Sequence, residues 1–215
     1  MALTVNEIFH SIQGESSFSG KPCVFIRLTG CNLRCSYCDT QYAYDNGSPI
    51  EINEIIRISA SYKCPLIEIT GGEPLIQEET PALIRHLLDG GYQVLVETNG
   101  SQDIGITDDR CIRIVDIKCP SSGEHKSNDL ENLFRLTDRD EIKFIIGDRN
   151  DYKFAKEILD LFYYKSARQN TIHFSPVSGI LPPDRLVKWI MKDHLNVRLN
   201  LQLHKIIWPH KQRGV

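Results

Sequence analysis

The sequence predicts an α/β fold: an abridged, partial (β/α) barrel of about six mainly parallel strands, with extra extended segments at the N- and C-terminal ends. Apolar, β-rich runs alternate along the chain with segments of helical periodicity, which is typical of parallel sheets joined by helical crossovers. Six strands with few long helices are too few for a closed eight-fold barrel. The 215 residues suffice for one sizeable core, so we expect a single domain, 1–215.

The six strands are expected where β-branched and aliphatic residues gather between turn residues. These runs cover residues 23–28, 66–70, 93–97, 112–117, 142–146 and 171–174. Helical faces fall between several of them, at 52–59, at 83–88 before Gly90 and Gly91, at 154–162, and after Pro182 and Pro183. Between Cys119 and Leu136 the chain is polar and leaves room for a short helix at most, which abridges that crossover.

A further strand is predicted at residues 198–206, where leucines alternate strictly with polar residues. Such alternation is typical of a half-buried strand. The two faces carry Leu199, Leu201 and Leu203 on one side and Asn200, Gln202 and His204 on the other.

The composition excludes several classes of protein. The net charge of −3 gives no basic field for nucleic acid or an anionic membrane, and no apolar run approaches the ~20 residues that span a bilayer. Glu7 and His10 stand where a signal peptide would need an apolar stretch. Seven cysteines in a chain too large to need disulfides indicate a reducing compartment, so we expect a cytoplasmic protein.

Three cysteines, Cys31, Cys35 and Cys38, stand in a C-x3-C-x2-C spacing directly after a predicted strand. A structural zinc site takes four closing ligands, and a [4Fe–4S] cube normally takes four thiolates. A cube held by three thiolates leaves one iron open, which could bind the amino and carboxylate groups of S-adenosylmethionine. The alternatives are a zinc knuckle with a distant fourth ligand, or three free thiols. The other cysteines are expected in the core: Cys23, Cys64, Cys111 and Cys119.

Polar groups follow several predicted strands at their carboxyl ends, where parallel α/β folds bind ligands. Gly71 and Gly72 would let a ligand approach the backbone closely, although an ordinary turn before a helix also explains such a pair. The other strand ends carry Glu97, Thr98, Asn99 and Gly100; Asp116, Ile117 and Lys118; and Phe174, Ser175, Pro176 and Val177. Each could be a simple strand-end turn, but together they predict one shared site.

Three further features bear on binding. Arg27 lies inside an apolar strand, and a buried guanidinium needs either an internal carboxylate or a carboxylate-bearing ligand. Gln13 and Glu15 face the same way in an extended segment and could bind the N–H edge of a guanine-like or pterin ring, although polar residues before a loop are usually solvated. Thr40 could cap a helix or bind Mg²⁺ through oxygen.

The chain resembles radical S-adenosylmethionine enzymes, whose signature is the three-cysteine loop with an aromatic residue before the last cysteine, here Tyr37, followed by Gly-Gly-Glu-Pro after the second strand. Its flanks resemble the 7-carboxy-7-deazaguanine synthase family over residues 5–208. The most specific stretch is Phe9-His10-Ser11-Ile12-Gln13-Gly14-Glu15. The others include Cys38-Asp39-Thr40, Glu97-Thr98-Asn99-Gly100 and Gln202-Leu203-His204-Lys205.

The resemblance implies a ring-contracting lyase that converts 6-carboxy-5,6,7,8-tetrahydropterin to 7-carboxy-7-deazaguanine with loss of ammonia, a step toward queuosine and other 7-deazapurines. Its implied cofactors are a [4Fe–4S] cluster, S-adenosylmethionine and Mg²⁺. A deoxyadenosyl radical would take a hydrogen from the substrate and later recover it. The resemblance also implies a homodimer, and a reductant such as flavodoxin or ferredoxin would supply the electron.

Carried over by position, the resemblance assigns Cys31, Cys35 and Cys38 to the cluster and Thr40 to Mg²⁺. Contacts to S-adenosylmethionine fall on Ser36, Tyr37, Asp39, Gly72, Asp116, Ile117, Lys118, Phe174, Ser175, Pro176 and Val177. Contacts to the pterin fall on Ile12, Gln13, Gly14, Glu15, Arg27, Thr70 and His204. No protein acid–base pair is expected, because the radical transfers the hydrogen.

Two other functions compete with this one. An activating enzyme for a glycyl-radical partner shares the cysteine loop, but it needs an open mouth for a protein loop rather than Arg27 and the clamp at residues 13–15. A non-catalytic zinc module would leave Gly-Gly-Glu-Pro and the polar strand ends unexplained. Metal analysis distinguishes iron and sulfide from zinc.

Overall fold

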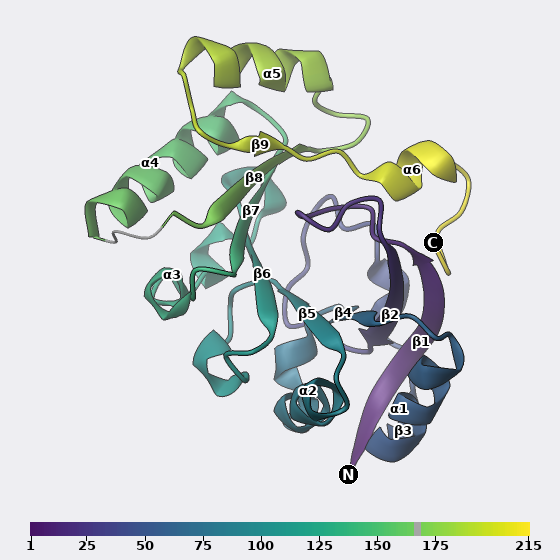
Figure 1. Ribbon diagram of the computed structural model, residues 1–215. Coiled ribbons are helices and arrows are strands. Elements are labelled where there is room, and N and C mark those ends of the chain that lie inside the picture. Colours follow the sequence, from purple (N-terminus) through teal and green to yellow (C-terminus); the bar gives the residue numbers. More distant parts are fainter. Residues whose placement is uncertain (166–168) are drawn as a thin grey trace.

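The computed structural model describes residues 1–165 and 169–215 and shows one sheet in the order β3-β1-β2-β4-β5-β6-β7-β8-β9 (Figure 1). The six predicted strands are confirmed, and they pair with one another in parallel from β2 to β8. They are β2 (Pro22–Leu28), β4 (Leu66–Gly71), β5 (Gln93–Thr98), β6 (Ile112–Ile117), β7 (Glu141–Ile146) and β8 (Thr171–Pro176).

Three more strands extend the sheet at its edges. The N-terminal segment forms β1 (Ala2–Ile12), which lies antiparallel between β2 and the short β3 (Ser48–Glu51). At the other edge, β9 (Arg198–Leu199) pairs with β8 in parallel. Since β3 and β9 are not paired with each other, the sheet is an open, partial barrel.

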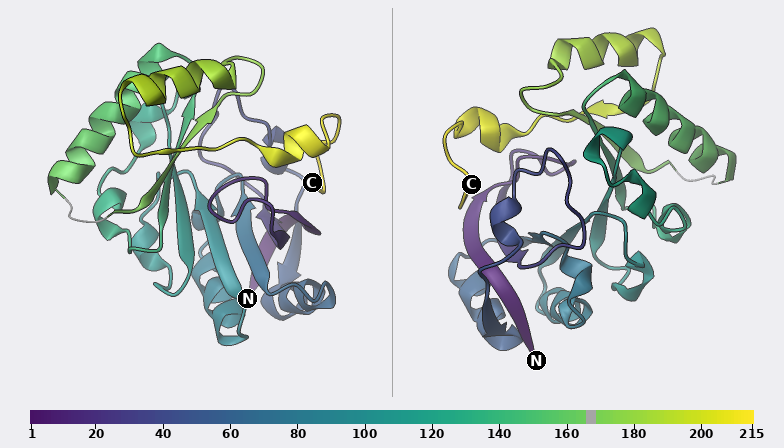
Figure 2. Two further views of the ribbon diagram at one scale, coloured as in Figure 1. Left: turned by 45° about the horizontal axis from the view of Figure 1, so that its top comes forward. Right: turned by 180° about the vertical axis from the view of Figure 1, so that it is seen from behind.

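Helices α1 (Ile52–Ser61), α2 (Thr80–Asp89), α4 (Arg149–Lys165) and α5 (Pro183–Lys192) cover the outer, convex side of the curved sheet (Figures 1 and 2). These four are the predicted helices. The stop after α2 is confirmed, because Gly91 has a φ of +84°, a left-handed conformation that glycine adopts without strain. The polar crossover before β7 holds only the four-residue α3 (Asn132–Arg135) and short 3-10 turns, as expected.

The prediction of a strand at residues 198–206 is correct for its first two residues and wrong for the rest. After β9 the chain leaves the sheet and forms α6 (Leu203–Ile207). Leu199 is 36% exposed, whereas Asn200 is 5% exposed and donates to Ser175 Oγ at 2.9 Å. The polar face therefore points inward. The physical reason is that the concave side of this sheet is itself polar, so the hydrogen-bonding side chain is the one drawn inward.

The two faces of the sheet differ sharply. On the convex side, the core forms between the sheet and the aliphatic faces of the helices. Its β2 members, Val24, Ile26 and Leu28, are fully buried. On the concave side, the register aligns Asp116 of β6, Lys143 of β7 and His173 of β8 in one row. Within the described residues, no helix has the length and apolar character needed to cross a membrane.

Residues 13–20, the loop after β1, lie inside the curve of the sheet (Figure 2). The Ser17 amide donates to Glu141 Oε2 on β7 at 3.0 Å, and the Leu203 amide donates to the Gly14 carbonyl at 3.0 Å. The loop thus connects the β1 side of the open barrel to the β7–β9 side. This bridge encloses a space at the carboxyl ends of the parallel strands.

Candidate active site

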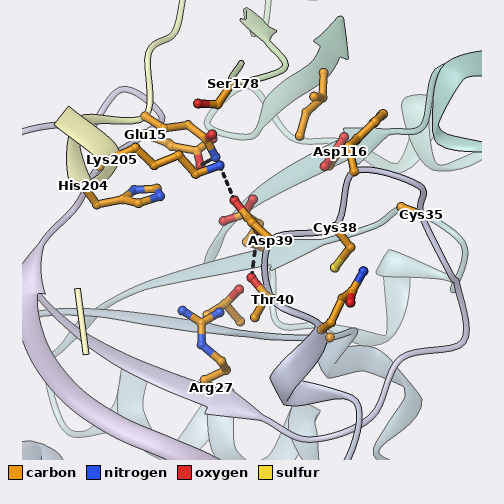
Figure 3. Close-up of a pocket in the computed structure, with 18 of the residues that line it drawn as sticks. Glu15, Arg27, Cys35, Cys38, Asp39, Thr40, Asp116, Ser178, His204 and Lys205 are labelled. Carbon is orange, nitrogen blue, oxygen red and sulfur yellow. Dashed lines mark hydrogen bonds and ion pairs between the residues drawn. The ribbon is translucent and has the colours of Figure 1, made fainter. Parts of the chain in front are cut away.

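A cavity of about 900 Å³ occupies that space (Figure 3). Its walls come from the strand ends, the cysteine loop at residues 29–40, the loop after β1 and the C-terminal segment. Most of the predicted site residues line it: Ile12, Gln13, Gly14, Glu15, Arg27, Cys31, Cys35, Ser36, Tyr37, Cys38, Asp39, Thr40, Thr70, Gly72, Asp116, Lys118, Val177 and His204. The expectation of one shared site at the carboxyl edge therefore agrees with the fold.

Four predicted contacts lie elsewhere. Ile117 and Phe174 are fully buried, and Phe174 packs edge-on against Phe144 in the core. Ser175 is buried under Asn200, and Pro176 ends β8. None of these four side chains lines the cavity, whereas Val177 of the same stretch does.

The glycine pair at the end of β4, Gly71 and Gly72, makes room for the cysteine loop. A Cβ at Gly72 would lie 2.2 Å from the Gly30 carbonyl oxygen and 2.6 Å from Cys31 Cβ. A Cβ at Gly71 would lie 2.3 Å from the Leu28 carbonyl oxygen. Because such distances are far below van der Waals contact, both positions require glycine. The close approach expected for a ligand is thus made first by the chain's own loop.

Glu73, for which the sequence suggested no role, fastens three segments together. Its amide donates to the Gly30 carbonyl at 2.8 Å. Its fully buried carboxylate accepts from the Asn99 amide at 2.6 Å, from Thr98 Oγ1 at 2.8 Å and from the Leu75 amide at 3.0 Å. Burial raises the pKa of Glu73, and these donors oppose the shift. The motif after β5 therefore helps to hold the cysteine loop.

The three cysteines are partly exposed on the cavity wall and carry free thiols. Burial raises the pKa of the Cys35 thiol, while the ammonium of Lys118 opposes that shift. Three thiols beside a buried cation fit the thiolate ligation of an iron–sulfur cluster. Among the described residues, no three His, Cys, Asp or Glu side chains gather closely enough to hold a single metal ion.

Acceptors and a cation lie beside the cysteines. Lys118 Nζ binds Asp116 Oδ2 at 2.7 Å, and the Asp116 carboxylate pulls the pKa of Lys118 up against the effect of burial. Asp116 Oδ1 is buried and has no hydrogen-bond partner within the described chain. Since an orphaned buried acceptor is costly, this oxygen fits a ligand hydroxyl or amine at the cavity wall.

A network of buried charges forms the far side of the cavity. Lys143, only 3% exposed, lies 3.1 Å from Glu15 Oε2 and also contacts Glu97 Oε1. Gln202 Nε2 donates to Glu15 Oε1 at 2.9 Å. Burial would raise the pKa of Glu15, but Lys143 and Gln202 outweigh it and leave that pKa lowered. Glu15 is therefore held as a carboxylate facing the cavity.

Glu68 extends this network on β4. It is 2% exposed, contacts the Gln13 side-chain amide, and lines the cavity. Burial and the nearby Glu97 raise the pKa of Glu68 well above its ordinary value. Lys143 and Glu68 were missed from the sequence, although Glu68 is the only charged residue of β4 and Lys143 interrupts the apolar run at residues 142–146. A charged residue within an apolar run is the signal that singled out Arg27.

Arg27 has the internal carboxylate partner that was one of its two expected partners: its Nε donates to Glu7 Oε1 at 2.9 Å. Thr40 stands at the N-cap of a 3-10 turn without making a capping bond, and its hydroxyl donates instead to Asp39 Oδ1 at 3.0 Å. Asp39 also pairs with Lys205 of α6 at 2.5 Å, which lowers the pKa of Asp39 to about 2 against the opposing effect of burial (Figure 3).

Comparison with known proteins identifies the family. The radical SAM superfamily model matches residues 25–120. The 7-carboxy-7-deazaguanine synthase of Koribacter versatilis is 41% identical, over 99% of this chain and 100% of the relative. That of Chlorobaculum tepidum is 43% identical, over 99% of this chain and 97% of the relative. The chain belongs to the 7-carboxy-7-deazaguanine synthase family.

The fold agrees with this membership. The crystal structure of QueE from Escherichia coli matches with a TM-score of 0.80 at 24% identity, over 94% of both chains. The predicted partial barrel of radical SAM type is thereby confirmed. Relatives named 7-carboxy-7-deazaguanine synthase favour neither the glycyl-radical activase nor the zinc module.

Proposed function

We propose that the chain converts 6-carboxy-5,6,7,8-tetrahydropterin to 7-carboxy-7-deazaguanine and ammonia, on the way to queuosine or another 7-deazapurine. The observation that carries the proposal is that one cavity joins the three cysteines to Arg27 and Glu15. A radical enzyme needs its cluster and its substrate within one enclosed space. A carboxylated pterin offers a carboxylate for a guanidinium and an N–H edge for a carboxylate.

Cys31, Cys35 and Cys38 would hold a [4Fe–4S] cluster, and S-adenosylmethionine would bind in the cavity beside the cysteine loop and Gly72. When bound, these groups supply the deoxyadenosyl radical that exchanges hydrogen with the substrate. The buried, unpaired Asp116 Oδ1 supports a contact to the polar part of that cofactor. Ser36, Tyr37 and Asp39 line the same side of the cavity.

The substrate would lie between Arg27 and the network around Glu15. Glu15, kept ionised by Lys143, would accept from the N–H edge of the ring, and Gln13 would complete that pattern. Ile12, Gly14 and Thr70 would close around the ring, and His204 would contact it from α6. A Cβ on Gly14 would lie 2.4 Å from His204 Nδ1, so glycine at this position lets the His204 ring pack closely against the loop.

Mg²⁺ would bind Thr40 beside the substrate carboxylate. The hydroxyl of Thr40 and the carboxylate of Asp39 are hard oxygen donors on the cavity wall. The hydroxyl makes no helix cap, which leaves it available for this role.

We also propose a single domain, a cytoplasmic location, a homodimer, and a reductant such as flavodoxin or ferredoxin. The continuous sheet supports the single domain. The free thiols of the buried Cys23, Cys64, Cys111 and Cys119 support a reducing compartment. Neither nucleic acid nor a membrane has a part in the proposed reaction.

The test is anaerobic turnover of protein reconstituted with iron and sulfide. The reduced protein is mixed with S-adenosylmethionine, Mg²⁺ and 6-carboxytetrahydropterin, and mass spectrometry follows 7-carboxy-7-deazaguanine and deoxyadenosine. We expect the product with deoxyadenosine well below one equivalent, since the radical recovers its hydrogen. Deoxyadenosine without the product would keep the radical enzyme and refute the substrate.

A further inference from the structure

Arg27 is held by one edge and leaves the other edge free. Its Nε donates to Glu7 Oε1 at 2.9 Å, and its Cζ lies 5.8 Å from the Phe9 ring centre and 5.7 Å from that of Tyr42. Within the described residues, the two η nitrogens have no hydrogen-bond partner, and Arg27 lines the cavity. The guanidinium is thus sandwiched between rings, with the fork that suits a carboxylate unused.

Glu7 owes its position to the strand pairing. It lies opposite Arg27 in the β1–β2 register, next to a bulge between Val5 and Glu7. A bulge re-aims the side chain that follows it and is frequent beside active sites. Both side chains of the pair are largely buried, with 15% of Glu7 and 13% of Arg27 exposed. The local geometry therefore fixes Glu7 against the arginine.

The same carboxylate also receives the C-terminal tail, residues 208–215. Oε2 of Glu7 lies 3.3 Å from the Gly214 amide and 3.9 Å from Arg213 Nε. Arg213 donates to Asn6 Oδ1 at 2.7 Å and stacks 4.8 Å from the centre of the Tyr42 ring, whose hydroxyl donates to Glu7 Oε1. These contacts hold a segment of which five residues line the cavity: Trp208, Pro209, Lys211, Gln212 and Val215.

We propose that Glu7 is a positioning residue that aims the free fork of Arg27 at the carboxylate of the pterin substrate and fastens the C-terminal tail over the same site. The inference rests on the proposed function and extends it to a residue outside the cavity lining. One carboxylate shared by two guanidiniums leaves one net positive charge for the incoming carboxylate. Arg27 is then oriented before binding, which lowers the entropic cost of binding.

An orienting role and a purely electrostatic role of Glu7 predict opposite changes in substrate affinity when Glu7 is removed. If Glu7 acted only through its charge, its removal would strengthen the attraction between Arg27 and a substrate carboxylate. If it acts by orienting Arg27, its removal weakens the binding of a carboxylated pterin and leaves a pterin without that group unaffected. The ratio of the two affinities therefore separates the roles.

The first experiment compares wild type, Glu7→Gln and Glu54→Gln as reconstituted, anaerobic enzyme with S-adenosylmethionine and Mg²⁺. Calorimetry measures the dissociation constants of 6-carboxytetrahydropterin and of tetrahydropterin. Glu54 is the matched control because its carboxylate pairs with Arg57 on the surface of α1. We expect Glu7→Gln to weaken the binding of the carboxylated pterin about tenfold or more, as for a lost charge-assisted hydrogen bond. The affinity for tetrahydropterin and both affinities of the control variant should stay unchanged. Equal or tighter binding of the carboxylated pterin would overturn the positioning role.

The second experiment reads the tail directly and needs no pterin. Hydrogen exchange of residues 208–215 is measured in wild type, Glu7→Gln and Arg213→Ala; Arg213 is half exposed, so its truncation does not threaten the core. Both variants should exchange faster in the tail than wild type, and unchanged exchange in both would refute the fastening role. Wild-type protein that binds neither pterin would refute the proposed function, whereas wild-type binding with an unaffected Glu7→Gln refutes only the inference.

Discussion

Removing the charge of Lys143 should strongly destabilise the fold. Its ammonium is 3% exposed and compensates Glu15 and Glu97, whose side chains are 14% and 26% exposed. Replacing it in Lys143→Met keeps the apolar stem and leaves these carboxylates without their cation. Breaking a buried ion pair costs about 3–5 kcal/mol, and the partial exposure of Glu97 favours the lower end, about 3 kcal/mol.

That loss is large against a typical total stability of about 5–15 kcal/mol. Urea unfolding followed by circular dichroism at neutral pH measures it. For a chain of this length it corresponds to a fall in melting temperature of about 6–12 °C, at roughly 2–4 °C per kcal/mol. Lys188→Met is the control, because Lys188 pairs with Asp184 in the open, with side chains 75% and 69% exposed. A loss of stability below about 1 kcal/mol for Lys143→Met would refute the role of Lys143 as the buried counter-ion of Glu15 and Glu97.

The pH dependence gives a second check. In the wild type, the pKa of Glu15 is lowered from 4.5, so this group adds stability above that pH and loses it as the pH falls. Without Lys143, burial dominates and raises the pKa of Glu15, so the unpaired carboxylate destabilises at neutral pH and is relieved by protonation. The difference in free energy of unfolding between wild type and Lys143→Met should therefore shrink as the pH falls from 8 to 4.5. A constant difference would contradict this origin.

Three further results are expected. Cys35→Ala should lose the iron and sulfide that a Cys111→Ala control retains, and a Cys35→Ala protein that still cleaves S-adenosylmethionine would sink the cluster assignment. Gly72→Ala should assemble no cluster while keeping its far-ultraviolet circular dichroism, since its Cβ would meet the cysteine loop at 2.2 Å; normal iron content would contradict this. Because Lys205 lowers the pKa of Asp39 from 3.8 to about 2, the stability difference between wild type and Lys205→Met should be present above pH 3.8 and vanish near pH 2; urea titrations at both ends decide.

The sequence by itself determined the parallel strands and the place of the site. Runs such as Ile112–Ile117 are buried on both faces of the sheet, so local composition suffices to mark them. The carboxyl ends of parallel strands share one edge, so the cysteine loop, Gly72 and Asp116 had to converge once the strands were identified. The chemistry of three cysteines is likewise local, because spacing along the chain sets it.

Only the tertiary structure decided which polar residues act together. Alternation at residues 198–206 shows that the two faces differ, but it does not show which face meets the interior; here the interior is charged, so Asn200 turns inward and the chain continues into α6. Glu7 and Arg213 are 206 positions apart, and no local pattern relates them. The physical reason is that a buried charge depends on partners supplied by distant segments, whereas a strand depends mainly on its own residues.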